Sequence, residues 1–359
     1  MTETAITTAD THHLEVRHPR LPRFAPVLVA AIATAAALLI GLSAHFSIAG
    51  IAVVGVLFYL VVLPTWAMIV ENRRAAVDRM MTSLVWCTLA IALVPLLSLV
   101  AMVVSKGAGQ LTGSFFTQSM RGVLGSGGGI EHALIGTLII TAAATAISVP
   151  IGVLAAVYLV EYGRTSRVAS SLRFLVDVMT GIPSIVAGLF AYALFALFFG
   201  PSVTMAFGGS VALSLLMVPI VVRSSEEMLK LVPEDLREAS YALGVPKWRT
   251  ITRVVLPTAS SGIITGVTLA IARVIGETAP LLLIAGETAA VNTNLFAPTT
   301  PTETLPVFIY TTYNNQTGPF AQLNVERAWG AALVLIIIVL ALNLLARLLG
   351  GLLAPAKAR

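Results

Sequence analysis

Charged residues are scarce in this sequence, where Asp, Glu, Lys and Arg make up 11% of 359 positions and hydrophobic residues make up 57%. A soluble domain typically carries about 25% charged residues. The mean hydropathy of +0.92 also lies on the side of membrane proteins. These values exclude a soluble globular domain. They predict an all-α polytopic membrane protein, since a helix satisfies its own backbone hydrogen bonds inside lipid.

Cysteine and catalytic motifs are also lacking. Cys87 is the single cysteine, so neither an internal disulfide nor a cysteine metal cluster can form. The glycine-rich run 125–129 lacks the Lys-Ser/Thr pair of a phosphate-cradling loop, and neither HExxH nor GxSxG occurs in the apolar stretches. We interpret His12, His13 and His18 as solvated side chains of a polar tail. We therefore expect no catalytic residue, no metal site and no cofactor bound by this chain.

Eight apolar stretches are candidates to cross a membrane, which takes about 20 residues. They lie at 26–45, 48–70, 80–104, 132–160, 173–199, 210–223, 257–285 and 328–350. The sixth is short, and we expect it to extend into flanking residues.

The net charge of +5 does not indicate a nucleic-acid partner, because the basic residues lie in short segments beside the apolar stretches. With the N-terminus inside, 18 of the 22 Lys and Arg fall in inner segments and three in outer loops. This bias is the positive-inside pattern. It predicts a multi-pass protein of the cell (plasma) membrane with both termini cytoplasmic and no nucleic-acid partner.

The polar run EASYALGVPKWRTITRVVLP, residues 238–257, lies between two apolar stretches. Pro233 suits the start of a helix, and Gly244 suits the left-handed position after its last turn. Pro246 then opens a second helix, which we expect Pro257 to end. The run thus predicts two short helices around a corner, projecting from the membrane.

This run resembles the EAA loop of the permeases of ABC importers, whose pattern is Glu-Ala-Ala, three residues, Gly, nine residues and Ile-x-Leu-Pro. The matching positions are Glu238, Ala239, Ser240, Gly244, Val254, Leu256 and Pro257. Ser replaces the second Ala and Val replaces Ile, while the spacing is unchanged. The resemblance implies that Glu238, Ala239, Gly244, Leu256 and Pro257 couple the chain to a separate ATPase subunit.

Two further runs are similar to the phosphate branch of these permeases: DVMTGIPSIVAGLFAY at 177–192 and ARVIGETAPLL at 272–282. We identify the chain as resembling the PstA type, with the paralogous PstC type as the nearest alternative. The resemblance implies a six-span permease core with two extra N-terminal spans. It also implies a transport subunit that is not itself an enzyme.

The resemblance divides the chain into four parts and two loops. We expect a cytoplasmic tail at 1–25, an extra transmembrane hairpin at 26–79, a permease domain at 80–350 and a cytoplasmic tail at 351–359; within the permease domain lie the coupling loop 224–257 and the outer loop 286–327. Within the outer loop, the run 305–313 is expected to form a short helix against the membrane surface.

Arg273 and Glu277 are charged residues inside an apolar stretch, where each costs about 2.5–3.5 kcal/mol on insertion scales. A guanidinium fork matches phosphate oxygens. We predict that both line the substrate path, on one face of a helix. Alternatively, they neutralise each other and join two helices. The resemblance favours the first interpretation, because an intramembrane Arg and a nearby Glu at matching positions are implicated in phosphate transport.

Four residues are expected to break helices near this path. They are Pro183, Pro219, Gly276 and Pro280. Nearer the cytoplasm, Asp177 follows Arg173 by four residues, and we expect these two to form a local ion pair.

The resemblance implies three partners besides membrane lipid. They are a homologous permease subunit of the PstC type, a dimer of ATPase subunits that holds ATP and magnesium, and an extracytoplasmic phosphate-binding protein. Other oxyanions, such as sulfate or molybdate, remain alternative substrates. A proton-coupled secondary transporter that uses Glu277 is a less favoured alternative.

Overall fold

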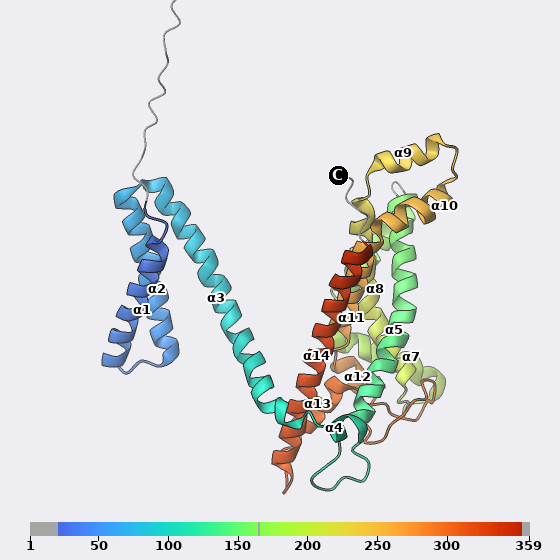
Figure 1. Ribbon diagram of the computed structural model, residues 1–359. Helices are drawn as coiled ribbons and strands as arrows, with labels where there is room; N and C mark the ends of the chain where they lie inside the picture. The colour runs from blue at the N-terminus through green and yellow to red at the C-terminus, as the bar shows by residue number, and fades with distance from the viewer. Residues whose placement is uncertain (1–20, 164–165, 354–359) are drawn as a thin grey trace, which may run out of the picture. The chain divides into compact units, whose positions relative to one another are not determined.

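The computed structural model describes residues 21–163 and 166–353 (Figure 1). The regular elements of this part are helices, with one isolated bridge between Thr204 and Thr299. The chain divides into two compact units, Met1–Val100 and Ala101–Arg359. The three tail histidines and most of the C-terminal tail, predicted at 351–359, lie outside the described residues.

The N-terminal unit contains α1 (Ala25–Ser43), α2 (Ile48–Val70) and most of α3 (Arg73–Gly107). Small residues let α1 and α2 approach closely, as is usual between membrane helices. A Cβ added to Gly41 would lie 2.2 Å from Ile51 Cγ1. The first two predicted spans are thus confirmed as a pair of packed helices.

The second unit is a bundle of long helices around α8 (Ala206–Lys230), which packs against α5, α6, α7 and α11. Leu213, Met217 and Val221 of α8 are fully buried at its centre. The other long helices are α5 (Glu131–Val157), α11 (Leu256–Val274) and α14 (Ala321–Leu353). The shorter elements are η1 (Ala108–Gln110), α4 (Gly113–Thr117), η2 (Tyr158–Tyr162), α9 (Glu234–Ala242), α10 (Lys247–Thr250), η3 (Ile251–Val255), α12 (Ala279–Ile284) and α13 (Leu305–Asn314).

The fifth predicted span, 173–199, is not one straight helix. It consists of α6 (Arg167–Thr180) and α7 (Ser184–Phe199), which are bent by 108° at the break between them. Pro183 occupies the N-cap of α7 with an extended ψ of 140°. A proline disfavours helical geometry in the residue before it, so the helix ends upstream. The predicted break at Pro183 is confirmed, and the continuous span is wrong.

Pro219 was predicted to break its helix, and this prediction is wrong. α8 runs through Pro219 without interruption from Ala206 to Lys230. Neighbouring helices surround α8, and membrane helices tolerate proline where such neighbours and local adjustments compensate for the lost hydrogen bond. Pro219 is itself buried in this packing.

Pro257 also lies within a continuous helix rather than at its end, so its predicted role as a terminator is wrong. One helix extends from Lys247 to Val274 through α10, η3 and α11. The segment η3 is a π-helical turn in which the Leu256 N–H donates to the Ile251 carbonyl. This wider turn directly precedes Pro257 and relaxes the hydrogen-bond ladder that a proline would otherwise disrupt.

The seventh predicted span, 257–285, is interrupted in the region where Gly276 and Pro280 were expected to break it. α11 ends at Val274, and α12 begins at Ala279 with Pro280 in its first turn. Gly276 lies in the connecting turn, although a Cβ there would meet only the Arg273 carbonyl at 4.0 Å. The breaks at Gly276 and Pro280 are confirmed. The described residues contain seven helices long enough to span a membrane, or eight with the bent pair.

The predicted helix in the outer loop is present as α13, but its first turn packs on protein rather than on a membrane surface. Leu305 and Phe308 are buried against α5 and α14, and Val307 is buried in the core around α8. The Leu305 N–H donates to Thr137 Oγ1 of α5 at 2.8 Å. The outer segment is therefore anchored to the bundle at this point.

Candidate functional site: the coupling segment and the intramembrane arginine

The coupling segment, defined here as residues 233–257, turns at one end of the bundle (Figure 1). Gly244 makes the corner with φ of +72°, a conformation that side chains with a Cβ rarely adopt. The Val245 N–H donates to the Ser240 carbonyl at 3.2 Å, which closes the turn after α9. The predicted helix, glycine corner and second helix are all observed.

The corner presents apolar side chains to solvent. Leu243 is 83% exposed and Trp248 is 58% exposed, and Glu238 and Ala239 are exposed on α9. Exposed large apolar residues gathered on a projecting element are typical of a protein-binding surface. Leu256 and Pro257 lie apart from the corner, in the first turn of α11. The predicted coupling residues therefore form two groups along the segment.

A buried ion pair joins α9 of the coupling segment to η2. Arg237 of α9 donates to Glu161 Oε1 of η2 through Nε at 3.1 Å and Nη2 at 2.9 Å, and both side chains are 3% exposed. The remaining guanidinium donors reach the Val232 carbonyl at 2.6 Å and the Leu229 carbonyl at 3.0 Å. Because every partner is within hydrogen-bond distance, the buried charges are compensated.

Two further contacts attach α10, the second helix of the coupling segment, to α9 and to η2. Ser240 Oγ and Thr250 Oγ1 lie 2.8 Å apart in the interior of the corner. Lys247 Nζ donates to the Glu161 carbonyl and lies 4.8 Å from the centroid of the Tyr162 ring. Burial raises the pKa of the nearby Tyr241 phenol, and the Glu161 carboxylate raises it further. The raised pKa keeps the Tyr241 phenol neutral at physiological pH.

Arg273 lies in the last turn of α11, 16 residues beyond Pro257 and hence about 24 Å along the helix. Its side chain is exposed, and it forms no hydrogen bond or ion pair with any residue in the described part of the chain. A cation in the last turn complements the helix dipole. That interaction alone does not compensate for a charge at this depth.

Glu277 does not share a helical face with Arg273, so this part of the prediction is wrong. α11 ends at Val274, and Glu277 lies in the following turn, where its N–H donates to the Val274 carbonyl at 3.1 Å. Within the described ranges, no ion pair joins the two side chains. Mutual neutralisation, the alternative interpretation, is therefore not supported by the structure.

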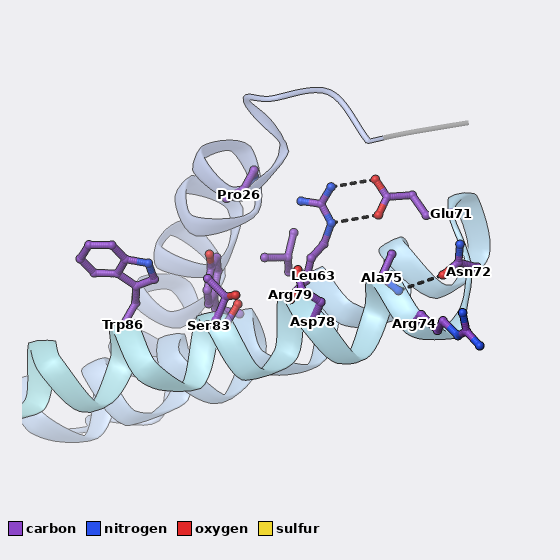
Figure 2. Close-up of a pocket in the computed structure, with 12 residues that line it drawn as sticks. Pro26, Leu63, Glu71, Asn72, Arg74, Ala75, Asp78, Arg79, Ser83 and Trp86 are labelled. Atoms are coloured by element: carbon purple, nitrogen blue, oxygen red, sulfur yellow. Dashed lines mark hydrogen bonds and ion pairs between the residues drawn. The ribbon is translucent and has the colours of Figure 1, made fainter. Parts of the chain in front are cut away.

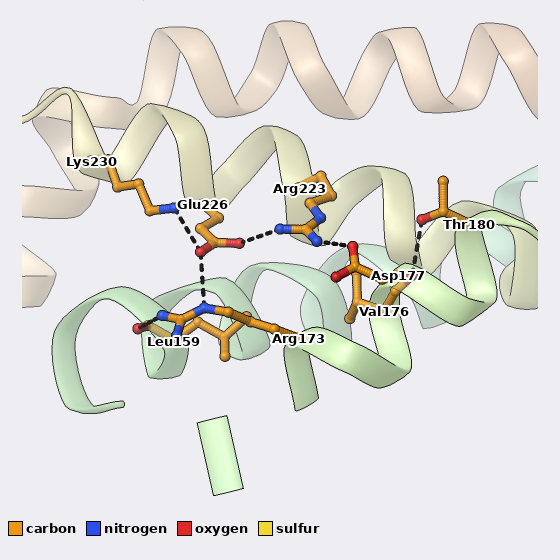
Figure 3. A network of polar contacts seen from close by, with 8 residues as sticks. All are labelled: Leu159, Arg173, Val176, Asp177, Thr180, Arg223, Glu226 and Lys230. Atoms are coloured by element: carbon orange, nitrogen blue, oxygen red, sulfur yellow. Dashed lines mark hydrogen bonds and ion pairs between the residues drawn. The ribbon is translucent and has the colours of Figure 1, made fainter. Parts of the chain in front are cut away.

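A second charged cluster joins α6 to the end of α8 (Figure 3). Glu226, whose side chain is almost fully buried, is contacted by Lys230 at 2.8 Å, Arg223 at 3.3 Å and Arg173 at 3.4 Å. Asp177 pairs with Arg223, not with Arg173 as predicted. Arg173 instead turns toward buried Glu226 and also donates to the Leu159 carbonyl, which explains the difference.

Comparison with known proteins assigns the chain to a family. Residues 148–359, more than half of the sequence, match the family described as binding-protein-dependent transport system inner membrane component. The chain belongs to this family. The PstA type, taken above from the sequence motifs, is confirmed by the relatives below.

This inner membrane component is similar to curated permeases over most of its length. It is 45% identical over 280 residues to phosphate transport system permease protein PstA 1 of Mycobacterium tuberculosis (strain H37Rv), covering 77% of this chain and 88% of the relative. It is 46% identical over 278 residues to PstA of Mycobacterium leprae, covering 77% and 89%. PstA of Yersinia pestis is 41% identical over 283 residues, covering 78% and 90%.

A solved structure has a similar fold to this chain. The MetNI methionine ABC transporter, solved in inward-facing conformations, aligns with a TM-score of 0.50 and 18% identity. The alignment covers 68% of this chain and all of that chain. At this identity the likeness concerns the fold alone, and it confirms an ABC importer permease fold.

Sequence reasoning missed Glu161 and Arg237, the buried ion pair that joins η2 to the coupling segment. They are 76 positions apart, so no local pattern joins them. One signal was available: Glu161 lies at the end of an apolar stretch, where a carboxylate needs a partner.

Replacing Gly244 with valine should uncouple ATP hydrolysis from transport. A β-branched residue at φ of +72° costs roughly 1–2 kcal/mol, so the corner is expected to reshape. We expect Glu238→Ala to act in the same direction. The measurement is substrate-stimulated ATPase activity and uptake in the reconstituted complex.

The matched control for this substitution is Gly109→Val. Gly109 lacks a positive φ, and an added Cβ there meets no atom within 4 Å. This variant should behave as the parent. Normal coupling in both Gly244→Val and Glu238→Ala would contradict a coupling role for the segment.

Proposed function

We propose that the chain is the transmembrane permease subunit of an ATP-driven importer of inorganic phosphate and forms half of the translocation path. The relatives with 41–46% identity carry the name of a phosphate transport system permease protein. The motif runs at 177–192 and 272–282 support the same substrate.

Arg273 is the observation that carries the proposal. An exposed guanidinium deep in a membrane helix, with no partner in the described part of this chain, requires a counter-charge or water from outside it. A phosphate ion in a path shared with a second permease subunit supplies that charge. The helix is interrupted directly after Arg273, between α11 and α12, and interrupted helices are common at transporter sites. Glu277 lies in this turn and also lines the path.

The subunit works with three partners. A homologous permease of the PstC type completes the path, a dimer of ATPase subunits receives the coupling segment, and an extracytoplasmic phosphate-binding protein delivers the substrate. Both termini face the cytoplasm, which places the coupling segment on the ATPase side. ATP and magnesium belong to the ATPase subunits.

Uptake of labelled phosphate tests the function. Vesicles contain this chain with the partner permease and ATPase, the binding protein is added outside, and ATP is supplied or withheld in the ATPase compartment. We expect uptake that requires ATP and is competed by phosphate but not by sulfate. Uptake of sulfate or molybdate alone would overturn the substrate. Uptake that persists without ATP and collapses with the proton gradient would overturn the class.

A further inference from the structure

A cavity of about 820 Å³ lies within the N-terminal unit and has no part in the transport path proposed above (Figure 2). Its walls come from α1, α2 and the first turns of α3. Trp86, Ser83 and Arg79 project from the same side of α3 (Figure 2).

The cavity is amphipathic along its length. Charged and amide side chains lie around the start of α3, whereas Leu63 and Trp86 line the part deeper in the apolar helices. Arg74 and Trp86 are 12 residues apart on α3, which corresponds to about 18 Å. A ligand that fits this cavity has a polar end and an apolar body of similar length.

Arg79 and Glu71, which both line the cavity, form an ion pair with each other. Arg79 donates to Glu71 through Nε at 3.1 Å and Nη2 at 2.7 Å, and the Leu21 N–H reaches the same carboxylate at 2.6 Å. The bidentate pair joins α3 to the end of α2, and the Leu21 N–H bond attaches the entry to α1 to the same carboxylate.

Three other polar groups that line the cavity have no partner among the described residues. Arg74 and Asp78 are four positions apart on α3, yet no ion pair joins them or occupies either one. Ser83 is only 3% exposed, and its hydroxyl forms no hydrogen bond with the described chain. Ser83 is thus a buried residue whose hydroxyl faces the cavity and is available to a ligand there.

The arginines of the N-terminal unit lie at the end that holds the polar part of the cavity, which indicates that this part lies among lipid headgroups. The first turn of α3 carries Arg73 and Arg74, and Arg79 follows in the same helix, whereas the link 44–47 between α1 and α2 contains no Lys or Arg. The positive-inside pattern then puts the polar end at the cytoplasmic surface.

We infer that this cavity binds a glycerophospholipid of the cytoplasmic leaflet whose headgroup carries both a phosphodiester and a primary ammonium, as in phosphatidylethanolamine. Arg74 binds the phosphodiester and Asp78 accepts from the ammonium. Ser83, nine residues and about 13 Å deeper, donates to an ester carbonyl of the glycerol backbone. The acyl chains then continue past Leu63 and Trp86.

Lipid retention by the purified full-length chain tests this inference. The chain is extracted from vesicles with equal amounts of phosphatidylethanolamine, phosphatidylcholine and phosphatidylglycerol, and the bound lipid is identified by native mass spectrometry. We expect one retained phosphatidylethanolamine per chain, lowered about tenfold by Arg74→Gln. Asp78→Asn should remove the preference over phosphatidylcholine, whose quaternary ammonium cannot donate a hydrogen bond.

Arg73→Gln is the matched control, because Arg73 is an adjacent exposed arginine that does not line the cavity. It should retain lipid as the parent does. Equal loss in Arg73→Gln and Arg74→Gln would show a general charge effect and overturn the site. Equal retention of the three lipids would overturn the headgroup assignment. Displacement by millimolar inorganic phosphate would identify free phosphate as the ligand and likewise overturn the inference.

Discussion

Arg273→Gln is expected to abolish phosphate uptake while the complex with the ATPase still assembles. Glutamine keeps much of the length and polarity of arginine but lacks its charge. Hydrogen bonds to a charged group contribute about 1.5–3 kcal/mol each, so losing one lowers uptake about 10- to 100-fold, and losing a bidentate contact lowers it further. The measurement is ATP-dependent uptake together with the yield of the co-purified complex.

Arg273→Lys and Arg121→Gln complete this experiment. Lysine keeps the charge but loses the planar fork, so we expect intermediate uptake. Arg121 lies in the exposed outer segment before α5, and its loss should leave uptake unchanged. Normal uptake by Arg273→Gln at normal expression would remove this residue from the path and would leave the family assignment intact.

Arg237→Met should destabilise the coupling segment more than any surface substitution in it. The change leaves Glu161 buried without its partner, and breaking a buried pair in this way costs about 3–5 kcal/mol. We expect rapid protease cleavage within 230–250, a lower melting temperature of the purified chain and loss of the co-purified ATPase. Local opening of this size is measurable by limited proteolysis.

A double-mutant cycle separates lost packing from the unpaired charge. Glu161→Leu combined with Arg237→Met removes both charges, so the double variant should be more stable than Arg237→Met alone. Arg253→Met is the control, because Arg253 is exposed on η3 within the same coupling segment. A double variant as unstable as the sum of the single variants would show that the ion pair is not what holds α9 to η2.

The helices and the coupling corner were predictable because their signals are local. Hydropathy over about 20 residues predicts a span, and a glycine after a helix predicts a left-handed corner, as Gly244 confirms. The break at Pro183 was also predictable, but the resulting 108° bend was not. That angle depends on how α7 packs against α8 and α12, which no local pattern contains.

The charged contacts were the least predictable features. Spacing of four residues predicted an ion pair between Arg173 and Asp177 and a shared helical face for Arg273 and Glu277, and neither is observed. Asp177 pairs across 46 positions with Arg223, because packing of α6 on α8 offers a partner that sequence spacing does not. The second pair fails because α11 ends between its members. Spacing rules apply only where the helix continues.

The helix from Lys247 to Val274 is continuous, so a change of tilt at one end displaces the other end. Trp248 near the start of this helix and Arg273 near its end are 25 residues apart, or about 38 Å. A tilt of about 10° around the Trp248 end therefore sweeps Arg273 through an arc of about 7 Å, which exceeds the helical pitch of about 5.4 Å. With the π-helical turn η3 and Pro257 held rigid, a modest rotation imposed on the corner would thus carry the guanidinium past a full turn of a neighbouring helix.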